Sequence, residues 1–172
     1  SRISKGIPVV NLLNIDKDEK VQAMVPYNLE DEHKYLFFVT KNGTIKKTKL
    51  SEYNSNRSGG LNAIGLNEGD ELIKVEITNG ENDVIIGTYL GNAIRFNERD
   101  VRPMGRTAHG VRGIRLKKDD YVVSAVKVEE GTQLLTITEN GYGKKTDFDE
   151  YKVQSRGGTG VFNYKLTEKT GP

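Results

Sequence analysis

Short apolar runs recur along the chain, and each ends at a turn that contains glycine. Three of them occupy residues 35–40, 84–88 and 134–138 and consist mostly of Val, Ile, Leu, Phe and Thr. Runs of about four to six residues are typical of strands and are too short for helices. No window of about 12 residues shows a convincing apolar period of 3.6, so the pattern predicts an all-β protein.

The turns after these runs carry Asn and Gly, which tolerate the positive φ of a tight β-hairpin. We expect a two-residue hairpin turn at each of three places. The turn pairs are Asn42-Gly43, Gly91-Asn92 and Asn140-Gly141. Further alternating runs, such as residues 72–77, are separated by acidic segments. They predict additional strands, so that each unit holds about four.

The turn glycines belong to a repeat of about 50 residues. Gly43, Gly91 and Gly141 are separated by steps of 48 and 50. A Thr stands three residues before each glycine, and a cation stands four residues after it. The cations are Lys47, Arg95 and Lys145. A second marker, a Gly followed six residues later by Leu, has steps of 54, 50 and 50 and occurs at Gly6, Gly60, Gly110 and Gly160.

Four-stranded units of about 40–50 residues are the signature of propeller blades, which stack around an axis because one blade cannot bury both its faces. The 172 residues hold about 3.4 repeats, fewer than the roughly 4–8 blades of a closed propeller. The sequence therefore predicts a propeller fragment of about 3–4 blades in a single repeat-built domain. Its units lie near residues 1–55, 56–105 and 106–155, with the start of another at 156–172.

Composition excludes several kinds of site. The chain has no Cys and only two His, so disulfides, thiolate zinc sites and multi-histidine metal sites are excluded. His109 is expected to be a surface polar residue, not a base. No apolar run approaches the roughly 18 residues of a transmembrane helix. The aromatic residues fall mostly at apolar strand positions, and we expect them in the core and not as stacking platforms for bases.

The formal net charge of +2 hides a segregation of charge along the repeat. Residues 91–118 carry +6 and residues 41–57 carry +4, whereas residues 67–83 carry −5. A mixed, solvated surface would also be charged, but a basic stripe that recurs once per blade can follow the phosphates of a nucleic acid. The candidate contact residues are Lys46, Lys47, Arg57, Arg95, Arg106, Arg112, Arg115, Lys144, Lys145 and Arg156.

Two glycine-rich loops, residues 57–60 and 156–160, each begin with Arg. Exposed backbone N–H groups beside an Arg can bind anions. Tight connections in which only Gly avoids a clash would have the same composition, and this structural interpretation is favoured. Neither loop ends in the Gly-Lys-Ser/Thr of a nucleotide-binding P-loop, so ATP binding is not expected.

The segment Ile94–Leu116, with the sequence IRFNERDVRPMGRTAHGVRGIRL, closely resembles the C-terminal domain of bacterial DNA gyrase A. Residues 6–13 and 141–146 resemble other segments of that family, and the resemblance extends over the whole chain. The family's seven-residue box, Gln-basic-Arg-Gly-Gly-basic-Gly, has a degenerate copy at residues 154–160, where Ser155 and Thr159 replace the basic residues. This departure implies that the chain binds and bends DNA without necessarily supporting a full wrap.

The resemblance implies a β-pinwheel, a propeller whose blades exchange strands, with duplex DNA wrapped on its basic outer rim. It implies an accessory role in ATP-dependent negative supercoiling by an A2B2 complex with gyrase B and the rest of gyrase A. The cleaving Tyr motif of that family has no match here, so no catalysis and no cofactor are expected of this chain. ATP and Mg would be used by other parts of the parent enzyme. The expected location is the bacterial cytoplasm at the nucleoid, with no membrane partner.

Three alternatives remain open from the sequence. The chain could be the C-terminal domain of the corresponding protein of topoisomerase IV, although the 94–116 motif favours gyrase. It could be a propeller scaffold for protein interactions, which would bind its partner without salt dependence. A propeller enzyme or lectin would need polar groups converging on the channel, and lectins often use Trp, which this chain lacks.

For DNA binding through some 6–8 cations, log K should fall against log salt with a slope of roughly −5 to −7.

Overall fold

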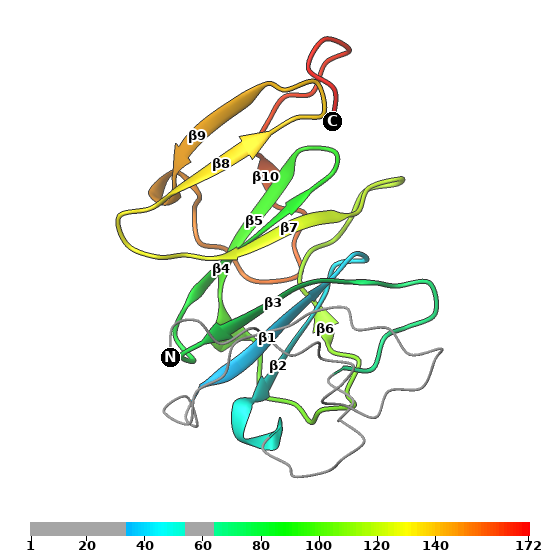
Figure 1. The fold of residues 1–172 in the computed structure, drawn as a ribbon, viewed down its shortest axis with the longest axis vertical. Coiled ribbons are helices and arrows are strands. Elements are labelled where there is room, and N and C mark those ends of the chain that lie inside the picture. Colours follow the sequence, from blue (N-terminus) through cyan, green and yellow to red (C-terminus); the bar gives the residue numbers. More distant parts are fainter. Residues whose placement is uncertain (1–33, 54–63) are drawn as a thin grey trace, which may run out of the picture.

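A computed structural model describes residues 34–53 and 64–172 (Figure 1). The predicted contact Arg57, the loop 57–60 and the first repeat marker at Gly6 lie outside these residues. The strands are β1 (Tyr35–Thr40), β2 (Thr44–Lys49), β3 (Leu72–Thr78), β4 (Asp83–Thr88), β5 (Asn92–Asn97), β6 (Val111–Arg112), β7 (Val122–Lys127), β8 (Gln133–Ile137), β9 (Gly143–Asp147) and β10 (Val161–Phe162). Short 3-10 helices follow three hairpins: η2 (Leu50–Tyr53), η3 (Glu98–Asp100) and η4 (Phe148–Glu150). The described residues contain no helix long and apolar enough to cross a membrane.

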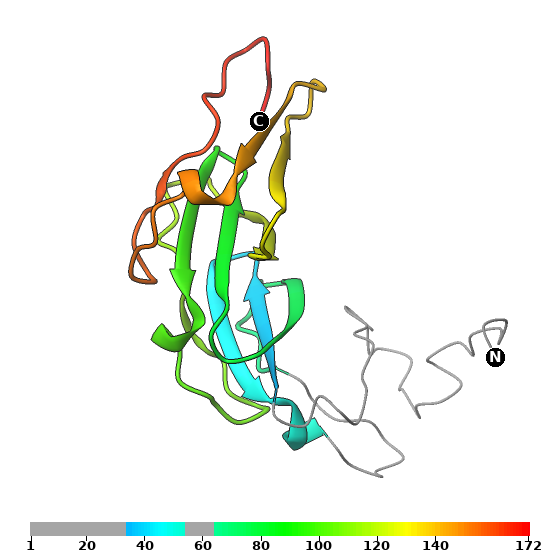
Figure 2. The same cartoon turned by 90° about the vertical axis from the view of Figure 1, so that its left-hand side faces the viewer.

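The strands form three antiparallel sheets that follow one another along the long axis of the molecule (Figure 2). The first sheet has the order β3-β1-β2-β6, the second has the order β10-β5-β4-β7, and the third pairs β8 with β9. β6 follows β5 in the chain, yet it pairs with β2 of the preceding sheet. β10 pairs in the same way with β5. Each of the first two sheets is therefore completed by a strand from a later repeat, which is the strand exchange of a pinwheel and confirms the predicted all-β propeller class.

The hairpin turns repeat with the expected period but are longer than predicted. Gly43, Gly91 and Gly141 have φ values of 83°, 83° and 82°, and each N–H donates to the carbonyl of the Thr three residues earlier. Three residues separate β1 from β2, and three separate β4 from β5. The two-residue prediction was wrong because the Asn residues do not adopt positive φ; in a three-residue loop a single left-handed Gly suffices.

In the first two hairpins the recurring Thr also closes the turn through its side chain. The Oγ1 atom of Thr40 accepts the N–H of Thr44 at 3.1 Å, and that of Thr88 accepts the N–H of Asn92 at 3.1 Å. These bonds satisfy a backbone donor at the hairpin, where ladder pairing stops. Turn geometry therefore explains the Thr at positions 40 and 88, whereas the hydroxyl of Thr138 donates to the carbonyl of Thr170 at 2.6 Å.

The core lies between successive sheets. Phe37 and Ile45 of the first sheet pack against Ile86 and Phe96 of the second. On the opposite face of the second sheet, Ile85 belongs to a smaller core with residues of η4 and its flank. The inner strands β3 and β7 lie side by side, and Lys127 Nζ donates to the carbonyl of Ile77 at 3.1 Å. The short strands β6 and β10 therefore lie at the other, outer edges of their sheets.

The third sheet differs from the prediction of four strands per unit, because only β8 and β9 are present in the described part of the chain. Its outward face carries Leu135 and Ile137, which are 55% and 65% exposed. The residues 98 positions earlier, Phe37 and Val39, are each 1% exposed because the second sheet covers them. The same repeat positions are thus core in one blade and surface in another.

Glycine at the strand exchange is required by close backbone contact. A Cβ atom on Gly110 would stand 2.2 Å from the carbonyl oxygen of Ile45, and one on Gly160 would stand 2.3 Å from that of Ala93. Both glycines have positive φ, at 99° and 74°. The structural interpretation of the glycine loop at 156–160 is therefore confirmed: the chain passes directly over the neighbouring strand there.

Candidate nucleic-acid interface

Two of the recurring cations tie one blade to the next. Lys47 Nζ donates to the carbonyl of Glu98 at 2.9 Å and lies 3.8 Å from its carboxylate. Arg95 Nη1 donates to the carbonyl of Phe148 at 2.6 Å. Glu98 and Phe148 are each the first residue of the 3-10 helix in the following blade. The recurrence of a cation four residues after the turn glycine is thus explained, in these two blades, by blade packing.

This packing leaves Lys47 and Arg95 poorly placed for the predicted DNA contacts. Lys47 is only 4% exposed, and burial lowers the pKa of its ammonium group, an effect that the Glu98 carboxylate opposes. The Arg95 guanidinium is 2.8 Å from the carboxylate of Asp83. Recurrence of a cation does not by itself indicate binding, because structural contacts recur with the repeat as well as binding contacts do.

Lys46 is also buried, with 0% of its surface exposed. Its Nζ donates to the carbonyl of Arg106 and lies 5.2 Å from the ring centroid of Phe38. Burial lowers the pKa of Lys46 to about 8, against the opposing effect of Glu52. Both ammonium groups are thus engaged within the protein, so burial disfavours the predicted phosphate contacts of Lys46 and Lys47, which stay predictions.

A basic surface forms instead at the outer edge, where segments from two repeats run side by side. The Gly157 N–H donates to the carbonyl of Gly113 at 2.7 Å, and the Arg115 N–H donates to that of Gly158 at 2.8 Å. Arg156 donates from Nη1 to the carbonyl of Arg112 at 3.0 Å, across 44 positions of sequence. These bonds bring together three of the predicted contacts.

Lys117 joins this surface, since its Nζ lies 4.6 Å from the ring centroid of Phe162 on β10. We call Arg112, Arg115, Lys117 and Arg156 the outer-edge cluster. Within the described residues none of the four forms an ion pair with a carboxylate. Lys117 was not among the predicted contacts, although it lies in the same +6 segment.

The other predicted cations lie apart from the outer-edge cluster in the described contacts. Arg106 is partly exposed in the loop before β6. Lys144 is exposed, with its Nζ 5.8 Å from the ring centroid of Tyr164. Lys145 is exposed on the uncovered face of β9 and is the repeat counterpart of Lys47 and Arg95. No contact in the described part of the chain joins these three to the cluster.

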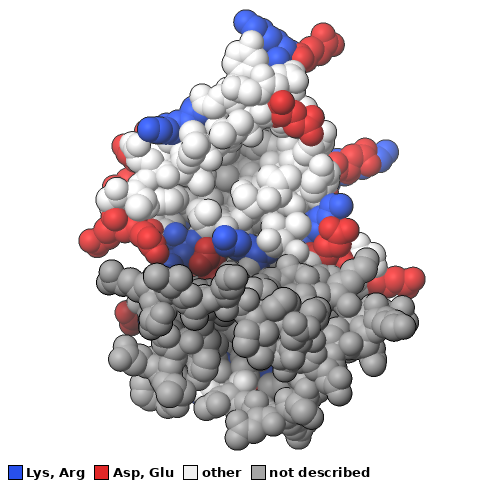
Figure 3. All heavy atoms as spheres, in the orientation of Figure 1, with Lys and Arg blue, Asp and Glu red and all other residues white. Residues whose placement is uncertain are grey.

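The face that carries β7 and β8 has a different character. Its described part is mostly uncharged, and the Lys and Arg side chains at its margins stand among Asp and Glu (Figure 3). It does not resemble a polyanion-binding surface, which needs an excess of positive charge.

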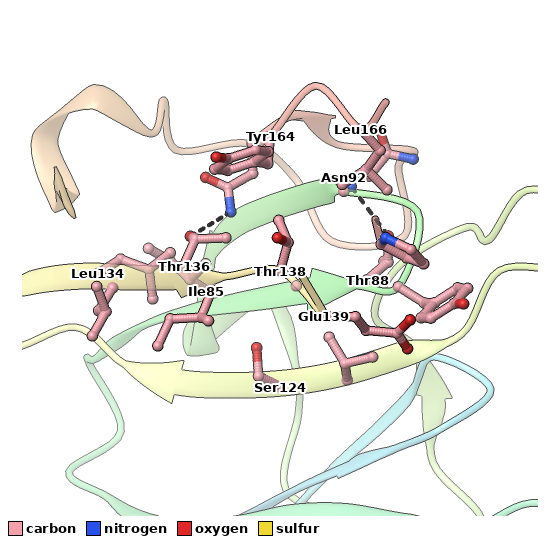
Figure 4. A pocket seen from close by; sticks show the side chains of 18 of the residues that line it. Ile85, Thr88, Asn92, Ser124, Leu134, Thr136, Thr138, Glu139, Tyr164 and Leu166 are labelled. Carbon is pink, nitrogen blue, oxygen red and sulfur yellow. Dashed lines mark hydrogen bonds between the residues drawn. The ribbon is translucent and has the colours of Figure 1, made fainter. Parts of the chain in front are cut away.

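A cleft of about 500 Å³ lies between the second and third sheets (Figure 4). Its polar groups are largely paired with each other: Thr88 with the N–H of Asn92, and Asn163 Nδ2 with Thr136 Oγ1 at 2.9 Å. Glu139 is the one carboxylate among the described lining residues. Among the described lining residues there is no second carboxylate side chain and no His to act with Glu139 as an acid–base pair.

Comparison with known proteins gives a consistent answer. A sequence model of the family described as "DNA gyrase C-terminal domain, beta-propeller" matches residues 1–28, 34–79, 82–129 and 132–171. Among curated relatives, DNA gyrase A of Salmonella typhimurium is 46% identical over 171 residues, and that of Escherichia coli is 44% identical over 171 residues. Each match covers 99% of this chain and 20% of the relative, so the chain spans about a fifth of the length of these proteins.

Solved structures agree with the fold. The C-terminal domain of DNA topoisomerase IV superposes with a TM-score of 0.81 at 34% identity, covering 91% of this chain and 49% of that one. A DNA gyrase A C-terminal domain superposes with a TM-score of 0.79 at 29% identity, covering 98% and 56%. The structural scores are similar, whereas the family match and the curated relatives quoted above are all of gyrase. The chain belongs to the family of DNA gyrase C-terminal domains.

Proposed function

We propose that this chain binds duplex DNA through the outer-edge cluster, without sequence readout, and bends it as the DNA-wrapping domain of a DNA gyrase A. The observation that carries this proposal is the meeting of Arg112, Arg115 and Arg156 from two repeats on one edge, free of carboxylate partners in the described residues. Strand exchange creates this arrangement, since it lays each repeat's basic loop against the preceding blade.

The energetics favour a rigid basic edge. Curving 20–30 base pairs by 40–90° costs of order 1–6 kcal/mol. Release of counterions from the contacted phosphates offsets that cost. Because Lys46, Lys47 and Arg95 are engaged within the protein, we expect fewer phosphate contacts than the sequence suggested. Four contacts from the outer-edge cluster give a slope of log K against log salt of about −4.

In the longer protein, the bent duplex would be presented to the DNA-cleaving part of gyrase A, and gyrase B would hydrolyse ATP. The result would be negative supercoiling by an A2B2 complex acting in the cytoplasm on the nucleoid. This chain would supply no catalytic group and no cofactor site. Its contribution would be DNA geometry.

The experiment compares two charge-matched double variants by fluorescence anisotropy with a labelled duplex at several salt concentrations. Arg112→Glu with Arg115→Glu reverses two cations of the cluster. Lys74→Glu with Lys169→Glu reverses two cations elsewhere, on β3 and beside the β8–β9 turn. We expect the first variant to lose most affinity and to flatten the slope by about 2, and the second to remain close to the unmodified chain. Equal loss in both variants would mean that net charge and not the outer edge governs binding.

A further inference from the structure

An aromatic side chain stands exposed within the outer-edge cluster. Phe162 on β10 is 75% exposed, the highest value among the large apolar residues of the described chain. The Nζ of Lys117 lies 4.6 Å from its ring centroid. A cation–π contact at an exposed site contributes about 0.5–1 kcal/mol, which favours this position of the ring and leaves most of its apolar surface open. The expectation that aromatic residues belong to the core fails at this position.

The position of Phe162 in its repeat is equivalent to that of Arg112 in the previous repeat. Gly110 and Gly160 make the same close contact with the preceding strand, and Phe162 stands two residues after the second of them, as Arg112 stands after the first. Arg112 is an exposed member of the cluster. Phe162 therefore occupies an outward-facing position where the previous blade presents a cation.

The exposure of Phe162 is not explained by the uncovered third sheet. Its neighbour is Lys117, in the segment that follows β6, and the hairpin with which β10 pairs, β4 and β5, is complete. Charge complementarity near the ring points to a polyanion, because Lys117 lies over the ring and the segments that carry the other cluster cations are joined to each other close by in the chain.

We propose that Phe162 enters a groove of the bound duplex and packs on its apolar groups, while the surrounding cations hold the phosphates on either side. This inference rests on the proposed DNA binding and adds a contact of a different kind. The apolar groups are deoxyribose faces in the minor groove or thymine methyl groups in the major groove. The contact is independent of salt, since no counterion is released when an aromatic ring is buried.

The test separates the salt slope from the affinity at fixed salt. Phe162→Ala should weaken binding about 10-fold at every salt concentration and leave the slope unchanged, because only apolar burial is lost. Phe162→Arg restores the residue type of the previous blade and should steepen the slope by about 0.9. Ile137→Ala removes another exposed apolar side chain, on β8 and outside the cluster, and should change neither quantity.

A duplex with uracil in place of thymine then identifies the groove. Loss of the Phe162→Ala effect on this duplex assigns the contact to thymine methyl groups, and its persistence assigns it to deoxyribose; either result upholds the inference. Equal DNA affinity of Phe162→Ala and the unmodified chain at all salt concentrations overturns the proposed contact. The proposed contact is also overturned if Phe162→Ala changes only the self-association of the chain, measured by sedimentation, and not its DNA affinity. If the unmodified chain shows no salt-dependent DNA binding, the proposed function fails and not this contact alone.

Discussion

Replacing Lys47 by Met tests whether the recurring cation stabilises the contact between adjacent blades. Lys47 Nζ donates to the Glu98 carbonyl at 2.9 Å and lies 3.8 Å from a carboxylate that is itself fully buried. Removing one member of a buried ion pair costs about 3–5 kcal/mol. Glu98 keeps hydrogen bonds from Thr78 Oγ1 at 2.8 Å and from the Asn82 N–H at 2.9 Å, so the lower end, about 3 kcal/mol, is expected.

For a chain of this size, a loss of about 3 kcal/mol lowers the melting temperature by about 6–12 °C. Thermal unfolding followed by circular dichroism measures this shift, with Lys49→Met, an exposed lysine on the same strand, as a control that should change stability by less than about 0.5 kcal/mol. Adding Glu98→Gln to Lys47→Met should recover part of the loss, because the uncompensated charge is gone. An unchanged melting temperature together with a DNA-binding slope shallower by about 0.9 would refute the tie and restore Lys47 as a phosphate contact.

Two further predictions concern stability. Gly110→Ala should lower the free energy of unfolding by about 3 kcal/mol or more in chemical denaturation, because its Cβ would meet the carbonyl of Ile45. Gly69→Ala, also at positive φ but with open space around it, should lower it by only about 1 kcal/mol. Equal losses would refute a role for the close approach to Ile45. The lowered pKa of Lys46 means that the unfolded chain binds more protons between about pH 8 and the ordinary value of 10.5, so stability should rise with pH across that window. Chemical denaturation at several pH values measures this rise in the free energy of unfolding, and Lys46→Met should make it smaller. An equal rise in Lys46→Met would mean that other titratable groups cause it.

Local features of this fold could be predicted from the sequence because their causes are local. Apolar runs and turn glycines predicted the hairpins, and the period of about 50 residues predicted the blades. The length of the turns was not predictable from dipeptides, since one left-handed Gly replaced two permissive residues at Gly43 and Gly91. The exchanged strands β6 and β10 are two residues long and pair with strands far away in sequence, and no local pattern identifies such partners.

The candidate site was predictable in part. Arg112, Arg115 and Arg156 were expected contacts, and the structure brings them together; whether they bind DNA stays a prediction. The burial of Lys46 and Lys47 could not be predicted, because their acceptors are backbone carbonyls that any residue could supply. The exposure of Phe162 could have been predicted from the repeat. Phe162 and Arg112 each stand two residues after a repeat glycine, and Arg112 was already expected on the surface, but aromatic residues in general were assigned to the core.

Cross-linking shows directly whether duplex DNA lies along the outer edge. The chain has no Cys, so a single introduced thiol carries a benzophenone at one defined place. Thr159→Cys puts it on the exposed loop beside the Arg115–Gly158 hydrogen bond, and Val123→Cys puts it on the inner strand β7, where the side chain is 49% exposed. We expect cross-links to a duplex from position 159 and few from position 123. Equal yields, or a higher yield from position 123, would mean that the duplex does not lie along the outer edge.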